Sequence, residues 1–508
     1  MFLSVASLQH KGLTSDEPEN YHYGLSVLQG HSIKVEKNSL VRMPNLALNA
    51  LTIYFGNDLE SQIKNGRYVT IFFLLILSSL VFYWSKELYG IIPAIFSLFL
   101  FCLDPNFIAH GQLVTLDVPT ALAMTMSLYF YWKFLRHGGN KRMFVSATVV
   151  GISQLVRLTC LSLYFIFIFI AFLKYFPIII ESLEQKNFFH LRKMLRKFLK
   201  NIMIYFLFFL IIVNLGFGFY KSFTPLKDYT FLSNPFRFYQ TIPVIKDIPL
   251  PVPYPFLQGI DGAKYYGDTG ASFGNTYLLG HVKEGDVKGF TGYFLIAVLF
   301  KTPIGAIIII CISLLVYIFK FRYNRFIINE AFLLIPFGIL FIFCNFAVRF
   351  SYCIGVRYVL FIFPLLYIFC GRLFVSWCRF SKIAKGAFIA LFMYIALSVF
   401  SYFPHYISYF NEFVWDRRRA YEILADSNID WGGNDWFLEQ YLKKYPDSLV
   451  EPNHPTAGRI IVGINHLVGL LNGEDFRWLR ENFKPNDQIA YSYLVYIVSK
   501  DDLIKKNL

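Results

Sequence analysis

Ten long apolar runs limit the folds that this chain can adopt. Each run approaches the length of about 20 mostly apolar residues that a helix needs to cross the hydrocarbon core of a bilayer. The sequence therefore predicts an α-helical polytopic membrane protein with about 10–12 transmembrane helices. The predicted spans are residues 68–84, 88–103, 119–135, 143–157, 159–177, 201–219, 290–319, 331–349, 357–376 and 386–403.

At two places in the sequence the helix boundaries are open. Residues 143–157 and 159–177 form two separate spans, one long helix or a bent pair. The run 290–319 contains Lys301-Thr302-Pro303. Because proline disrupts the interior of a helix, this run is either continuous or broken at that point.

The distribution of Lys and Arg predicts the orientation in the membrane. These residues cluster in four short loops between apolar runs, which the positive-inside rule assigns to the cytoplasm. Alternating the spans places the remaining long segments on the extracytoplasmic side, and these are residues 1–67, 104–118, 220–289 and 404–508. The same pattern explains the formal charge of +15, so we expect no nucleic-acid partner.

Composition divides the chain into three parts. Residues 1–67 form a first external loop, and the transmembrane helix expected before it is not found in the sequence. Residues 68–403 form the transmembrane core, with an aromatic external loop at 220–289 that we expect to lie at the membrane surface. Residues 404–508 alternate helical stretches with short apolar runs, which predicts a small external α/β domain.

Two groups of polar residues lie at the predicted external membrane boundary. Asp16 and Glu17 are adjacent carboxylates before the first span, and a carboxylate at the edge of a low-dielectric slab can act as a general base. Taken alone, the pair is more often a solvated turn or a helix N-cap. Asp104, His110 and Asp117 lie in the next external loop, with Asp117 at the positive end of a predicted helix. Helix capping by Asp117 and a structural His110 explain this group equally well.

Three basic residues lie inside apolar surroundings, namely Arg157, Lys301 and Arg357. Charges within a membrane are costly and are functional candidates for that reason. A lipid phosphate is the natural anion at this depth. The alternative is that the long side chains reach the lipid headgroups without a specific partner.

A series of short motifs runs in order along most of the chain. They are Ser15-Asp16-Glu17-Pro18, Tyr23-Gly24, Ala109 to Pro119, Tyr277 to Gly280, Lys301 to Pro303, Ile354 to Arg357, Tyr409 to Asn411 and Asp426 to Gly432. Together they resemble the GT-C-fold glycosyltransferases of the protein O-mannosyltransferase and aminoarabinose-transferase group, in particular the bacterial family 39 type, the phospholipid carrier-dependent glycosyltransferases. Each motif alone is weak, but the ordered set is specific.

The resemblance implies inverting transfer of a sugar from a polyprenyl-phosphate carrier on the extracytoplasmic face of a bacterial inner membrane. Asp16 would then be the general base that deprotonates the acceptor, while Glu17 and Asp117 would shape the same site. Arg357 and Lys301 would bind the lipid phosphate that leaves, because preorganised cations stabilise such a charge.

The acceptor and the cofactor stay open. His110, Asp104 and His22 are candidates for binding the acceptor or a divalent metal ion, and no cofactor is certain. Asn20 and Tyr358 depart from the family pattern, which argues against a metal role for the histidines. The expected partners are a polyprenyl-phosphate-linked sugar donor, a protein, lipid or glycan acceptor, and the bilayer.

Two other functions fit parts of the pattern. A transporter or flippase of lipid-linked sugars would place binding residues near the bilayer midplane and usually shows internal repeats. Neither feature is evident here. A noncatalytic membrane scaffold with an external binding domain is the other alternative.

Overall fold

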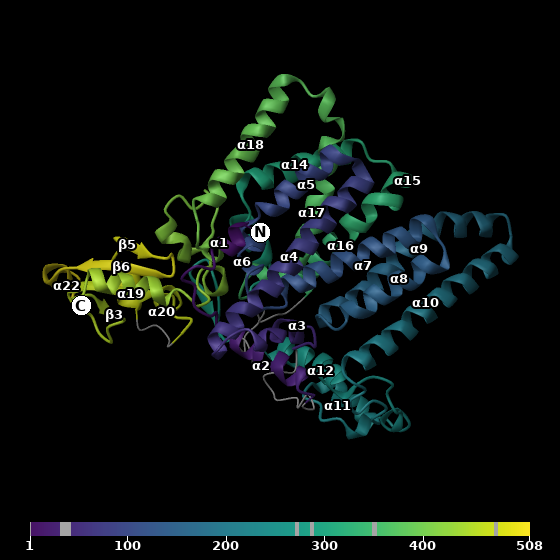
Figure 1. Ribbon diagram of the computed structural model, residues 1–508, viewed down its shortest axis with the longest axis horizontal. Coiled ribbons are helices and arrows are strands. Elements are labelled where there is room, and N and C mark those ends of the chain that lie inside the picture. Colours follow the sequence, from purple (N-terminus) through teal and green to yellow (C-terminus); the bar gives the residue numbers. More distant parts are fainter. Residues whose placement is uncertain (1, 31–41, 270–273, 285–288, 348–352, 472–475) are drawn as a thin grey trace.

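The computed structural model describes residues 2–30, 42–269, 274–284, 289–347, 353–471 and 476–508. Long helices form the main body, and a smaller lobe of strands and short helices lies at one end (Figure 1, yellow). The predicted fold class, an α-helical polytopic membrane protein with a small C-terminal α/β part, is confirmed.

Within the described part of the chain, six helices are long and apolar enough to cross a membrane. They are α4 (Leu59–Tyr89), α9 with the turn before it (Leu158–Glu184), α10 (Phe188–Gly216), α16 (Ala331–Ile342) with its flanking turns (Tyr323–Phe346 in all), the continuous span Val356–Arg379 and α18 (Lys382–Phe400). The span Val356–Arg379 consists of η8 (Val356–Ile362), α17 (Phe363–Cys370) and η9 (Gly371–Arg379).

A seventh span is broken. α13 (Tyr293–Lys301) and α14 (Ile304–Phe319) meet at an angle of 114°. Pro303 lies between them and cannot donate the hydrogen bond that would continue the first helix. Of the two possibilities that the sequence allowed, the run is thus broken at Lys301-Thr302-Pro303.

The three remaining predicted spans differ from simple transmembrane helices. α5 (Ile91–Cys102) has 12 residues and α8 (Asn140–Ser153) has 14, so both are shorter than the hydrocarbon core. α7 (Asp117–His137) has 21 residues but is more polar, and most of it is buried in the bundle. α8 and α9 (Ser162–Glu184) are separate helices, which answers the question left open above.

Short elements occupy the predicted external segments. They are α1 (Phe2–Ala6), α2 (Glu17–Leu28), α3 (Leu46–Ala50), α6 (Pro105–His110), α11 (Asn234–Thr241), α12 (Tyr254–Thr269) and the hairpin of β1 (Thr276–Leu278) and β2 (His281–Lys283). α2, α3 and α12 lie together below the bundle in Figure 1. None of them is long enough to span a bilayer.

The C-terminal lobe contains a four-stranded sheet of order β3-β4-β6-β5. β3 (Leu449–Val450) runs parallel to β4 (Gly458–Gly463), whereas β6 (Tyr493–Val498) and β5 (Asp487–Ile489) are antiparallel to their neighbours. The lobe also contains α19 (Asp435–Lys444), α20 (Ile464–Leu467), α21 (Arg477–Asn482) and α22 (Lys500–Lys505).

An apolar core holds this sheet to its helices. Ile461 and Val495 are paired across β4 and β6, and both are fully buried. Phe437 and Leu438 of α19 pack against them. The alternation of helical and apolar stretches after residue 404 thus predicted the lobe correctly.

Candidate active site

Two segments that are distant in the sequence meet beside the first turn of α2. The backbone N–H of Ser15 donates to the carbonyl of Trp431 at 3.1 Å, and that of Gly12 donates to the carbonyl of Gly433 at 2.9 Å. Gly433 has φ +81°, and a Cβ atom there would lie 2.9 Å from the carbonyl oxygen of Gly12. Only glycine allows this close approach. We call residues 12–15 together with 431–433 the strap.

Asp16 follows the strap and contacts a buried cation. It occupies the N-cap position of α2, but its side chain makes no capping hydrogen bond. Instead, Arg357 Nη1 donates to Asp16 Oδ2 at 2.9 Å, where the Arg357 side chain is 8% exposed and the Asp16 side chain is 45% exposed. The guanidinium also lies 3.7 Å from the centre of the Trp431 ring. A half-exposed carboxylate and a nearly buried arginine therefore share one site.

Asp117 belongs to the same electrostatic group. Arg157 Nη1 donates to Asp117 Oδ1 at 2.8 Å, and the Asp117 side chain is only 4% exposed. The ring of Tyr358 lies between two arginines, 5.1 Å from Arg157 and 5.0 Å from Arg357. The structure thus brings Asp16 and Asp117 to one place, joined through two guanidinium groups.

Several buried polar atoms at this place have no hydrogen-bond partner in the described part of the chain. They are His110 Nδ1, Thr115 Oγ1, Asp117 Oδ2 and Arg357 Nε. Burial lowers the pKa of His110 to about 4, so its ring is neutral at pH 7. Because buried polar groups are normally hydrogen-bonded, this set points to a site that binds polar groups of a substrate.

Glu17 has a different environment from its neighbour Asp16. Its carboxylate is fully buried and accepts hydrogen bonds from Arg67, at 2.8 Å from Nε and 2.6 Å from Nη2. It also accepts from the backbone N–H groups of Thr14, at 2.9 Å, and Val114, at 3.0 Å. Glu17 therefore joins the strap, α4 and the loop before α7. The arrangement is that of a positioning residue rather than one that reaches substrate.

Replacing Glu17 by Gln is expected to lower the free energy of unfolding by about 1.5–3 kcal/mol, because hydrogen bonds to a buried charge are lost. Thermal unfolding of the purified protein in detergent measures the change. Glu19→Gln is the matched control, since the Glu19 side chain is 59% exposed and pairs with Arg42 at the surface. Equal stability of both variants would contradict the structural role of Glu17.

Lys301 and Asp104 form part of the support behind the site. Lys301 Nζ donates to the carbonyl oxygens of Ile407 and Asn428, each at 2.6 Å. Asp104 accepts from the hydroxyl of Tyr367 at 2.6 Å. The ammonium group expected to bind phosphate thus faces backbone carbonyls, and it holds the segment that contains Asn428 against the broken span.

The residues considered for a metal do not come together. His22 is exposed on α2, whereas His110 and Asp104 are buried. In the part of the chain that the structure describes, no group of three or more His, Cys, Asp or Glu side chains could hold a metal ion. Glu17 and Asp117 are each paired with an arginine. The donor set therefore does not fit a divalent cation, and no step is assigned to one.

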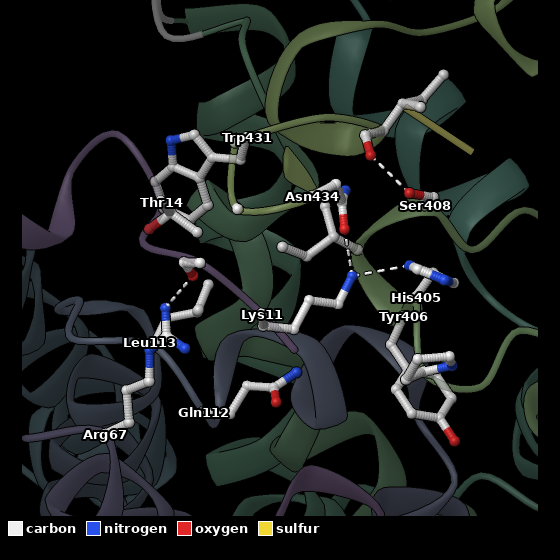
Figure 2. Close-up of a pocket in the computed structure, with 16 residues that line it drawn as sticks. Lys11, Thr14, Arg67, Gln112, Leu113, His405, Tyr406, Ser408, Trp431 and Asn434 are labelled. Carbon is white, nitrogen blue, oxygen red and sulfur yellow. Dashed lines mark hydrogen bonds between the residues drawn. The ribbon is translucent and has the colours of Figure 1, made fainter. Parts of the chain in front are cut away.

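A small pocket behind the strap contains a basic residue that the sequence did not single out. Lys11 Nζ donates to Asn434 Oδ1 at 2.5 Å and contacts His405 Nδ1 at 2.8 Å, as Figure 2 shows. Burial lowers the pKa of Lys11 to about 7, and burial together with Lys11 lowers that of His405 to about 3. The contacts tie the N-terminal segment to the C-terminal lobe. Lys11 lies in a loop without a motif, so only the fold reveals it.

Comparisons with known proteins show a similar family and a similar fold. The family model of dolichyl-phosphate-mannose-protein mannosyltransferases matches residues 48–217. ArnT from Cupriavidus metallidurans bound to undecaprenyl phosphate aligns with 97% of this chain and 96% of its own, at 11% identity and a TM-score of 0.50. Part of the chain thus matches that mannosyltransferase family, and the whole chain has the GT-C fold of ArnT. The resemblance predicted from the motifs is confirmed.

Two further comparisons add little to this assignment. ArnT from the same organism in the apo state aligns at 12% identity over 97% of this chain and 95% of its own, but its TM-score of 0.29 is too low to support an argument. No curated protein matches the sequence. The spans and the fold together make the chain an integral, multi-pass membrane protein.

Asp426 is a further carboxylate that interacts electrostatically with Arg357. Its backbone has φ +57°, an unusual conformation for a residue other than glycine. Its neighbour Ser427 donates to the carbonyl of Ile354 at 2.7 Å, which holds the segment against the chain that leads into Arg357. Burial raises the pKa of Asp426 to about 6, Arg357 opposes the shift, and Asp16 adds to it.

This shift predicts a pH-dependent stability. A carboxyl group with a raised pKa in the folded state favours folding when it is protonated, and that advantage is lost as pH rises from about 4 to about 6. Wild type should therefore lose unfolding free energy relative to Asp426→Asn over this interval, with a constant difference above it. Asn is a suitable replacement because it tolerates positive φ. Thermal unfolding from pH 4 to 8 tests this, and a pH-independent difference would contradict it.

Proposed function

We propose that the protein transfers a sugar from a polyprenyl-phosphate carrier to an acceptor on the extracytoplasmic face, with inversion at the anomeric carbon. The observation that carries the proposal is the contact of half-exposed Asp16 with nearly buried Arg357 at 2.9 Å. Such a site combines a base that an acceptor can reach with a cation that a lipid phosphate can reach.

The chemistry needs one base and a stabilised leaving group. Asp16 accepts the proton of the acceptor hydroxyl or amine as its lone pair attacks the anomeric carbon. The bond between that carbon and the phosphate oxygen breaks, and its electron pair goes to the phosphate. The product is the free polyprenyl phosphate, whose added negative charge is stabilised by Arg357. A separate acid is not required, because phosphate leaves as an anion.

The ion pair also suggests an order of events. Asp16 and the carrier phosphate would both be partners for Arg357, so arrival of the phosphate competes with the Asp16 contact. An Asp16 carboxylate released from Arg357 is free to accept a hydrogen bond from the acceptor. Asp117 pairs with Arg157, the second arginine of the site, which lies against the ring of Tyr358. Binding of the carrier thereby prepares the base.

Two findings support a carrier of this class. The matching family is described as using dolichyl-phosphate-mannose, and the ArnT structure is described as bound to undecaprenyl phosphate. Both are long isoprenoid chains with a phosphate headgroup. We also propose that the site faces away from the cytoplasm in a bacterial inner membrane, as the distribution of Lys and Arg predicts.

The proposal is tested by incubating the purified protein with polyprenyl-phosphate sugars labelled in the sugar and with candidate acceptors. Transfer of label together with release of free polyprenyl phosphate is expected. Movement of the intact labelled donor across vesicle membranes without release would instead indicate a flippase. Neither release nor movement, with any donor tested, would count against both functions.

A further inference from the structure

The segment before α2 docks on the start of α19. The His10 ring stacks on the ring of Trp436, with 3.9 Å between the ring centres and 16° between the ring planes. Lys11 Nζ lies 5.2 Å from the centre of the Phe437 ring. Both aromatic residues belong to the first turn of α19. Two neighbouring side chains therefore hold the N-terminal segment to the C-terminal lobe.

Lys11 also makes polar contacts with two other parts of the chain. Its ammonium group donates to Asn434 Oδ1 at 2.5 Å and to His405 Nδ1 at 2.8 Å, as Figure 2 shows. Because an ammonium group only donates, the His405 ring accepts through Nδ1 and carries its proton on Nε2. Asn434 in turn donates to Ser492 Oγ at 2.5 Å, directly before β6. We call Lys11, His405 and Asn434 the clasp.

The clasp closes one end of the strap, and Asp16 lies at the other end. Lys11 directly precedes the first segment of the strap, and Asn434 directly follows the second. Backbone hydrogen bonds link the two segments between these ends. Asp16 directly follows the first segment and accepts from Arg357 at 2.9 Å. A shift of one segment against the other would therefore move the Asp16 carboxylate.

The backbone of the strap gives it little rigidity of its own. Three of its seven residues are glycine, namely Gly12, Gly432 and Gly433. Glycine loses more conformational freedom on folding than any other residue, so ordering this segment is costly. Side-chain contacts at the ends of the strap can offset that cost. Lys11 supplies such contacts through its two hydrogen bonds.

We propose that Lys11 is a positioning residue, which holds the Asp16 carboxylate in place by closing the clasp at the far end of the strap. The inference rests on the proposed function, in which Asp16 is the general base. Proton transfer requires the base within hydrogen-bond distance of the acceptor. A misplacement of about 1 Å can lower a rate by about 10²-fold, so a looser strap lowers turnover even when the protein is folded.

Replacing Lys11 by Met tests the role, because Met keeps an unbranched apolar side chain but has no hydrogen-bond donor. Turnover at saturating donor should fall by about tenfold, whereas Lys11→Arg, which keeps donors, should stay within about threefold of wild type. Lys264→Met is the matched control. Lys264 is 48% exposed and pairs with Asp268 within α12, so its loss should change turnover by less than about twofold.

A double-mutant cycle separates positioning of Asp16 from general support of the fold. When Asp16 is replaced by Asn, no base remains to be positioned. Adding Lys11→Met to Asp16→Asn should then lower the residual turnover by less than about twofold. The same tenfold loss in both backgrounds would show that Lys11 does not act through Asp16 and would overturn the proposal.

Hydrogen exchange gives a readout that needs no substrate. The N–H groups of Gly12 and Ser15 donate within the strap, so Lys11→Met should speed their exchange by about tenfold, while peptides of α4 keep their wild-type rates. Unchanged exchange in the strap would overturn the proposal. An active wild type with unchanged turnover in Lys11→Met would overturn the role of Lys11 alone. A wild type without turnover on any donor would overturn the proposed function, and the role of Lys11 with it.

Discussion

Replacing Asp16 by Asn is expected to lower turnover by about 10²–10⁴-fold, the usual loss when a general base is removed. Asn preserves the size of the side chain and can still accept one hydrogen bond from Arg357, so the fold should be retained. Initial rates at saturating donor measure the effect. Size-exclusion elution and the thermal unfolding midpoint show whether the variant is folded.

The control for this prediction lies on the same helix. Glu19 is also an acidic residue near the start of α2, but its side chain is 59% exposed. Glu19→Gln should therefore keep its turnover within about twofold, whereas near-full turnover of Asp16→Asn would remove Asp16 from its catalytic role. Loss in both variants would indicate that α2 as a whole, rather than one carboxylate, determines activity.

The sequence predicted the helical membrane fold well because apolar length is a direct physical requirement of the bilayer. It predicted the C-terminal lobe for a similar reason. The short apolar runs that became β4 and β6 must be buried, and pairing them in a packed sheet buries them. It could not tell α5 and α8 from spanning helices. The lengths of those helices depend on turns such as the one around Gly90, where the chain adopts φ +102° between α4 and α5.

The sequence indicated the acidic residues of the candidate site but not the arginine with which each of them pairs. Asp16 and Glu17 are neighbours in sequence, yet one contacts Arg357 and is half-exposed while the other is buried against Arg67. No local pattern distinguishes two adjacent carboxylates, because the difference comes from partners 341 and 50 residues away. Arg67 carried a usable signal, a charge at the start of an apolar run.

Lys301 illustrates the opposite case. Its position within an apolar run favoured a functional cation, but the fold supplies two backbone carbonyls that occupy its ammonium group. Those carbonyls can accept from Lys301 because Ile407 and Asn428 lie in short turns, whereas the carbonyls of a regular helix are already hydrogen-bonded within the helix. Irregular backbone of this kind is formed by tertiary contacts, so its acceptors are not visible in the sequence.

Replacing Arg357 by Ala is expected to lower turnover by about 10²–10³-fold, the typical cost of removing one preorganised group that stabilises developing negative charge. Undecaprenyl phosphate should also bind more weakly, by about tenfold or more, because charge-assisted hydrogen bonds contribute about 1.5–3 kcal/mol. Binding of the acceptor, measured without the carrier, should change much less. Equal loss of both ligands would contradict a phosphate-binding role.

A second arginine serves as the matched control for Arg357. Arg417 stacks on the ring of Tyr402 at 4.0 Å and donates to the carbonyl of Ser401 at 3.1 Å, away from Asp16. Arg417→Ala removes the same charge and a similar aromatic contact without touching the candidate site. Arg357→Lys adds a further distinction, since it keeps the charge but loses the planar guanidinium that can donate two parallel hydrogen bonds to a phosphate. Carrier binding in that variant should lie between wild type and Arg357→Ala.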